Sequence, residues 1–274
     1  MSTLLLIVIF TAIGGILSVL AAGVFLLLPE QKRQSLLPHG ISFAIGALLT
    51  GAFCGLIPHA FEEVAAEDMQ MLSATILIGI LLFFVLEKLL VWRHCHSNAC
   101  EAHGEDSHDD HHGHRQQNDQ GRRVAGMFII LGDGIHNFVD GVLIGAAFLT
   151  DPQLGIVTSL AVTAHEIPQE VGDFAILLHS GYTRGKALFY NLLASLTTVI
   201  GGVLAYFSLG NLDHILPYFL TLAASSFIYI AVADLIPSLH QKTDIKTSLQ
   251  QIGFILAGVA LILVMQTIAH RFEG

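Results

Sequence analysis

The chain has 274 residues, of which 53% are hydrophobic and 12% are charged. Soluble domains carry about twice that share of charged residues, so an ordinary soluble globular protein is excluded. The net charge of −10 comes with no basic patch, which excludes a nucleic-acid partner and leaves the lipid bilayer as the expected surroundings.

Apolar segments recur along the whole sequence, and each is close to the roughly 20 residues that cross a bilayer as a helix. We therefore predict an all-α, polytopic membrane protein that forms one domain over residues 1–274. The first segment lacks a basic leading region, so it is interpreted as a membrane span and not as a signal peptide. The eight predicted spans cover residues 4–28, 38–61, 71–92, 124–149, 154–179, 185–209, 214–239 and 249–270.

The loops between these spans alternate in charge. Loops after the odd-numbered spans contain basic residues such as Lys32, Arg33 and Arg122, whereas loops after spans two, four and six contain none. Because basic loops stay in the cytoplasm, this pattern predicts that both termini lie outside. A plasma membrane, specifically a bacterial inner membrane, is the expected location.

The loop of about residues 94–123, between spans three and four, is rich in metal-ligating side chains. Such a composition cannot build a packed core, so we expect disorder, with loose binding of zinc or copper. A solvated linker without a metal role is the alternative. The ligating residues are His94, His96, His103, His108, His111, His112 and His114, with Cys95 and Cys100.

Two similar short sequences, in spans two and seven, indicate internal symmetry. Leu56-Ile57-Pro58 near the end of span two resembles Leu235-Ile236-Pro237 near the end of span seven. If spans four and five form a central pair, the first three and last three spans run in opposite directions. This predicts a 3+2+3 inverted-repeat bundle, an arrangement common in secondary transporters.

Span four carries ionisable residues where a charged group is costly. His136 and Asp140 are one helical turn apart, Asn137 follows His136, and Asp133 precedes it. Imidazole and carboxylate groups suit zinc and neighbouring divalent metals. The alternative is a structural His–Asp pair between helices, which does not explain why Asp133 adds a third ionisable group.

Span five is richer still. His165 and Gln169 share one helix face, and Pro168 leaves the carbonyl of Ala164 without its usual donor, so we expect a kink. Charged residues within a span usually line a functional cavity. The polar residues of this stretch are His165, Glu166, Gln169, Glu170 and Asp173.

Two other functions remain open at this point. His165-Glu166-x-x-Gln169 is one residue short of the zinc-protease motif HExxH, so an intramembrane zinc-dependent hydrolase is conceivable. Gln169 replaces the second zinc-binding His of that motif and argues against it. A non-transporting metal sensor would use the same residues.

The stretches 136–141 (HNFVDG) and 165–173 (HEIPQEVGD) resemble those of the ZIP (ZRT/IRT-like) metal transporters, and most of all the subfamily whose fifth helix reads HExPHExGD. The resemblance covers nearly the whole chain and implies eight spans, external termini and a His-rich cytosolic loop. It implies import of Zn²⁺ as a substrate, without an enzymatic activity or resident cofactor; some members carry Fe²⁺, Mn²⁺ or Cd²⁺. A homodimer is allowed, since Gly201-Gly202 would permit close helix contact.

The resemblance also implies a set of metal ligands. A first metal would be bound by His136, Asp140, His165 and Gln169. A second metal would be bound by Asn137, Asp140, Glu166 and Gln169, with Asp140 bridging the two. The subfamily usually has His where this chain has Gln169, and Thr198 aligns with a position that is acidic in some bacterial relatives.

Deletion of residues 94–120 is expected to leave a functional transporter with altered affinity or regulation, because this loop is separate from the predicted ligands. The measurement is zinc flux in reconstituted liposomes, beside the full-length chain. Complete loss of flux in a correctly folded deletion variant would contradict the prediction.

Overall fold

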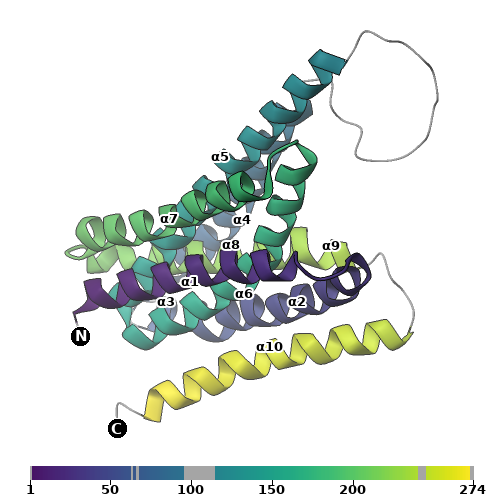
Figure 1. Ribbon diagram of the computed structural model, residues 1–274. Coiled ribbons are helices and arrows are strands. Elements are labelled where there is room, and N and C mark those ends of the chain that lie inside the picture. Colours follow the sequence, from purple (N-terminus) through teal and green to yellow (C-terminus); the bar gives the residue numbers. More distant parts are fainter. Residues whose placement is uncertain (1, 63, 66–67, 96–114, 240–244, 272–274) are drawn as a thin grey trace.

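The computed structural model describes residues 2–62, 64–65, 68–95, 115–239 and 245–271, and this part of the chain is helical without a β-strand (Figure 1). The predicted all-α fold is confirmed. The long helices are α1 (Thr3–Phe25), α2 (Glu30–Thr50), α4 (Met69–Cys95), α5 (Arg115–Thr150), α6 (Pro152–His179), α7 (Arg184–Leu209), α8 (Leu216–Tyr229) and α10 (Ile245–Arg271). The short ones are η1 (Gly51–Leu56), α3 (Ile57–Glu62), η2 (Asp213–Ile215), η3 (Ile230–Leu235) and α9 (Ile236–Leu239).

Within the described residues, seven helical stretches are long and apolar enough to cross a membrane. They match every predicted span except 154–179. That segment forms the 28-residue helix α6, whose polar centre lowers its hydropathy below that of the others. Two boundaries were wrong. Helix α2 begins at Glu30 and not at residue 38, since Pro38 lies inside the helix, and α5 begins at Arg115 and not at residue 124, so the last part of the predicted loop is helical.

The helices form a bundle with both chain termini at one end and the first turns of α5 at the other (Figure 1). Helices α1, α5, α6 and α7 pack against one another, while α2 packs on α10 and α4 on α8. The apolar windows of α4 and α10 are only 11% buried, so these two helices occupy the periphery, where lipid would contact them.

The closest helix contact joins α5 to α7 through glycine. A Cβ atom added to Gly141 would lie 1.9 Å from the carbonyl oxygen of Thr198, and one on Gly201 would lie 2.1 Å from that of Phe138. Small residues permit such close approach of two backbones in membranes. Gly201 and Gly202, which the sequence left available for dimer contacts, are therefore used inside the chain.

The contact between α2 and α10 is built in the same way. A Cβ atom on Gly46 would lie 2.0 Å from the carbonyl oxygen of Ile255, and one on Gly258 would lie 2.2 Å from that of Phe43. Glycine therefore permits close backbone approach in both of these helix pairs.

Two six-residue π-helical segments, η1 and η3, interrupt the second and seventh predicted spans. Each is followed directly by Ile-Pro, at Ile57-Pro58 and at Ile236-Pro237. The two similar sequences therefore follow segments of the same backbone conformation, which supports the inverted-repeat pattern. Such π-helical turns are rare and occur mostly at functional sites.

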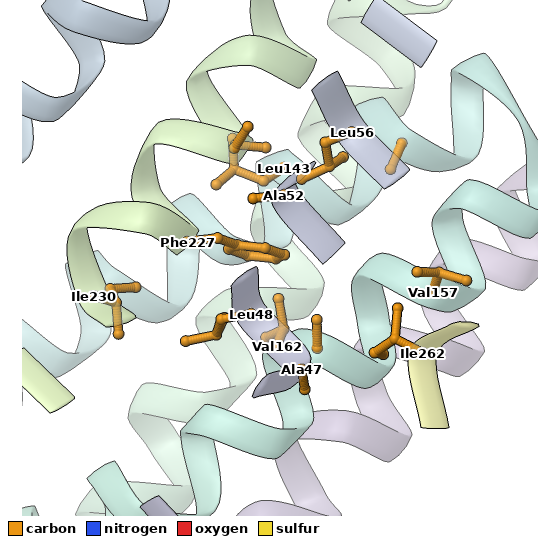
Figure 2. Close-up of a cluster of buried hydrophobic side chains, with 14 of the residues drawn as sticks. Ala47, Leu48, Ala52, Leu56, Leu143, Val157, Val162, Phe227, Ile230 and Ile262 are labelled. Atoms are coloured by element: carbon orange, nitrogen blue, oxygen red, sulfur yellow. The ribbon is translucent and has the colours of Figure 1, made fainter. Parts of the chain in front are cut away.

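A buried apolar core joins α2, η1, α5, α6 and α8 (Figure 2). The ring of Phe227 lies near its centre, close to Leu48, Ala52 and Leu143. The same ring meets the imidazole of His165 edge-on, with 6.3 Å between the ring centroids. The core thus borders directly on the polar residues of α6.

Replacement of Gly141 by Ala is expected to destabilise the protein by about 1–3 kcal/mol, because the new methyl group would collide with the α7 backbone. Thermal unfolding in detergent measures this. The matched control is Gly253→Ala in α10, where nothing lies within 4 Å of the added Cβ. Equal melting temperatures for the two variants would contradict the glycine contact.

Candidate metal centre

Four side chains from two helices converge in the interior. His136 and Asp140 project from α5, and His165 and Glu166 from α6. One ligand atom from each lies within 4.8 Å of all the others. We call these four residues the His–carboxylate cluster.

The cluster is compact and buried. Nε2 of His165 lies 3.2 Å from Oδ2 of Asp140 and 3.3 Å from Nε2 of His136. Nε2 of His136 lies 3.5 Å from Oε1 of Glu166. His165, Asp140 and Glu166 are at most 2% exposed, whereas the side chain of His136 is 23% exposed.

A short turn between α5 and α6 brings His136 and Asp140 of α5 level with His165 and Glu166 of α6. Oδ1 of Asp151 accepts hydrogen bonds from the backbone amides of Gln153 and Leu154, both at 2.8 Å. This N-cap begins α6 immediately after α5 ends at Thr150. The helices are consequently antiparallel neighbours, as predicted from the length of the connection.

The two ring nitrogens of His165 have separate neighbours. Nδ1 lies 3.3 Å from the carbonyl oxygen of Ala161. In the tautomer that carries its proton on Nδ1, this nitrogen donates to Ala161 and the lone pair of Nε2 is free to bind a metal, an orientation common among metal-binding His residues. Both carboxylate oxygens of Asp140 and of Glu166 are buried without a hydrogen-bond partner. Converging acceptors of this kind are stabilised by a bound cation or by a proton.

Asn137 lies beside the cluster, but its amide group is already engaged. Its Nδ2 donates to Oδ1 of Asp133 at 2.8 Å, and its Oδ1 accepts from the hydroxyl of Thr198 at 2.8 Å. Thr198 thus positions Asn137, which was expected to be a metal ligand. The residues around Thr198 in the sequence did not indicate this positioning role.

Gln169 is half-buried one turn after His165, and within the described part of the chain it forms no hydrogen bond. The helix continues without a break through Pro168. Of the six predicted ligands, the structure therefore brings four into one cluster and leaves Asn137 and Gln169 next to it.

A cavity of about 1010 Å³ opens at the end of the bundle where α3 ends and α6 begins. His59 and Glu62, which the sequence suggested for an acidic mouth, both line it; their neighbour Glu63 lies outside the described residues. No Lys or Arg is among the described lining residues. Its ionisable side chains are His59, Glu62, Asp68, Asp151 and His214.

Asp151 and His214 were not predicted to belong to this mouth. They come from two short links that are far apart in the sequence, and their only local signal is a position between spans. Nδ1 of His59 is 2.9 Å from the carbonyl oxygen of Gly55, which leaves its Nε2 available to a ligand when Nδ1 carries the proton.

Comparison with known proteins gives the chain its family. The profile described as "ZIP Zinc transporter" matches residues 2–266. "Zinc transporter ZIP13" of Pongo abelii is 30% identical over 236 residues, which are 82% of this chain and 65% of that protein. "Metal cation symporter ZIP14" of Xenopus tropicalis is 28% identical over 314 residues, which are 93% of this chain and 68% of that protein.

A third relative, "Zinc transporter foi" of Drosophila melanogaster, is 41% identical over 143 residues, or 52% of this chain and 20% of that protein. The chain thus spans about two thirds of the first two relatives and a fifth of the third. All three are named as transporters and none as an enzyme, which removes the support for a hydrolase. The chain belongs to the ZIP zinc transporter family.

Proposed function

We propose that this protein imports Zn²⁺ into the cytoplasm through the His–carboxylate cluster, with zinc as the transported substrate and not a resident cofactor. The observation that carries the proposal is the convergence of four ligand side chains on α5 and α6, in which the carboxylate oxygens of Asp140 and Glu166 are buried without a hydrogen-bond partner. Family membership and the names of the relatives support the same conclusion.

The predicted topology, with basic loops in the cytoplasm, supports the import direction. The acidic cavity lined by His59 and Asp151 faces outside in this proposal and raises the local concentration of cations. The metal then exchanges water for the cluster ligands and leaves towards the loop of residues 94–123. In this arrangement α6 crosses the membrane as the fifth of eight spans, both termini are external, and the membrane is a plasma membrane, as in a bacterial inner membrane.

The ligand types favour zinc. Two imidazoles combined with carboxylates suit Zn²⁺ better than Mn²⁺, which prefers oxygen ligands; Fe²⁺ and Cd²⁺ remain possible competitors. A second metal, bridged by Asp140, would require Asn137 to exchange its Thr198 hydrogen bond for the metal and Gln169 to turn inward. The centre therefore holds one metal more readily than two.

A non-transporting sensor is the second candidate, since it would bind zinc through the same residues. The cavity at one end and the ligands in the interior favour transport, because a sensor requires no entrance of that size. Net flux separates the two functions.

Replacement of His165 by Ala is expected to abolish most zinc entry into liposomes that contain the purified protein, because it removes a buried ligand that lies 3.2 Å from Asp140. The measurement is zinc entry followed by an internal indicator, with manganese and iron as competitors. His179→Ala is the matched control, since His179 lies in the last turn of the same helix.

Undiminished flux in folded His165→Ala would refute the cluster as the transport site. Zinc binding without flux in the unmodified protein would instead identify a sensor. Flux only down a gradient from the cytoplasmic side would contradict import.

Replacement of Gln169 by His is expected to tighten zinc binding by roughly tenfold, equivalent to about 1.4 kcal/mol, because imidazole is a better zinc ligand than an amide. Isothermal titration in detergent measures the affinity. Gln70→His, at an exposed position at the start of α4, is the control for an added imidazole alone. Unchanged affinity in Gln169→His would place this side chain outside the coordination sphere.

A further inference from the structure

The side-chain amide of Asn137 is held in a fixed orientation beside the His–carboxylate cluster. Its Nδ2 donates to Oδ1 of Asp133 at 2.8 Å and to the backbone oxygen of Asp133 at 3.2 Å. Its Oδ1 accepts from the hydroxyl of Thr198 at 2.8 Å. The reverse orientation would place Oδ1 against the backbone oxygen of Asp133, which can only accept a hydrogen bond, so the network selects the observed one.

The oxygen atom of this amide lies next to the cluster but is directed at another helix. Asn137 precedes Asp140 by three residues on α5, so the two side chains share a helix face. Asn137 also lines a small cavity of about 10 Å³ together with Glu166 and Thr198. Its Oδ1 nevertheless bonds to Thr198 on α7, whereas the cluster lies between α5 and α6.

Thr198 makes a contact that differs from those of other threonines in the bundle. The hydroxyls of Thr11, Thr50 and Thr163 donate to the carbonyl oxygen four residues earlier, at 2.6–2.8 Å. The hydrogen bond that the structure gives to Thr198 instead crosses to α5. The two helices are close enough for this bond because Gly141 admits the carbonyl oxygen of Thr198 against the α5 backbone.

An additional amide oxygen would change the metal preference of the centre. The cluster combines two imidazoles with two carboxylates, and imidazole suits zinc. Carbonyl and carboxylate oxygens suit Mn²⁺. An amide oxygen added to the coordination sphere would therefore favour Mn²⁺, and an amide oxygen kept out of it favours Zn²⁺.

We infer that Thr198 is a specificity-determining residue, whose hydroxyl holds Oδ1 of Asn137 towards α7 and so keeps this oxygen from a metal in the cluster. Thr198 itself touches no metal in this account. It acts through Asn137 and is a positioning residue. The inference rests on the proposed function, because it requires metal at the His–carboxylate cluster.

The test measures Mn²⁺ and Zn²⁺ binding to the purified, metal-free, full-length protein in nanodiscs. Electron paramagnetic resonance follows the free Mn²⁺, and displacement of Mn²⁺ reports Zn²⁺. In Thr198→Val the ratio of the Mn²⁺ to the Zn²⁺ binding constant is expected to rise by about two- to tenfold, the factor that one hydrogen bond supports. Thr198→Ser retains the hydroxyl and is expected to keep the wild-type ratio. Thr198→Ala, which also lacks the hydroxyl, replaces Thr198→Val if the valine variant does not fold.

The matched control is Thr197→Val. Thr197 lies on the same helix, and its hydroxyl also reaches α5, where it donates to the backbone oxygen of Gly134 at 2.7 Å. Its loss weakens the same helix contact without releasing Asn137, so the wild-type ratio is expected. Asn137→Ala, alone and combined with Thr198→Val, is expected to give one and the same ratio, because the effect of Thr198 passes through Asn137.

An unchanged or lower ratio in folded Thr198→Val would overturn the role of Thr198, and so would an equal rise in Thr197→Val. A rise that Thr198→Val still causes in the Asn137→Ala background would exclude the route through Asn137. None of these results affects zinc import through the cluster. That proposal fails by a separate measurement, zinc flux that survives in His165→Ala.

Discussion

A buried carboxylate in an apolar medium is stable only when a cation or enough hydrogen-bond donors lie within reach. Helices α5 and α6 place Asp140 and Glu166 at 0% and 2% exposure, and in the described structure their only basic neighbours are the imidazoles of His136 and His165, without a Lys or Arg. Repulsion between these carboxylates opposes the close contact of the two helices. The remaining packing must therefore hold α5 and α6 together when no metal is bound, and a bound cation would add to their stability.

The glycine contact between α5 and α7 provides part of that packing and also reaches the metal centre. Because Gly141 brings the two backbones together next to Thr198, the Thr198 hydroxyl can donate to Asn137 at 2.8 Å. Asn137 in turn donates to Asp133. A chain of hydrogen bonds thus links the α5–α7 interface to Asp133, one turn before His136 on α5. A change in the spacing of α5 and α7 would therefore alter whether Oδ1 of Asn137 is free to bind a cation.

The sequence predicted the helices well, and it predicted that the side chains of His136 and Asp140 lie close together, because helical spacing carries that information. His136 and Asp140, four residues apart, share a face whatever the rest of the fold does. The state of Asn137 was not predictable, because it depends on Thr198, 61 residues away. Nor was the contribution of Asp151 and His214 to the cavity, which arises from tertiary packing of two links. Mean hydropathy does not place α6 among the membrane-crossing helices, because polar residues such as His165, Glu166 and Glu170 lie at its centre.

The apolar core separates the large cavity from the metal centre. Along α5, the buried residues Leu143 and Phe148 lie between Asp140 and the cavity wall at Leu149. On α8, Leu220 lines the cavity whereas Phe227, two turns further, meets His165. A hydrated divalent cation cannot enter such a layer without losing water in apolar surroundings, which costs many kcal/mol. The carboxylates beyond the layer can offset that cost only once they coordinate the ion, so the proposed route requires the core around Phe227 to separate. The π-helical segments η1 and η3 contribute residues to this core, and their departure from α-helical hydrogen bonding lies where the proposed movement would take place.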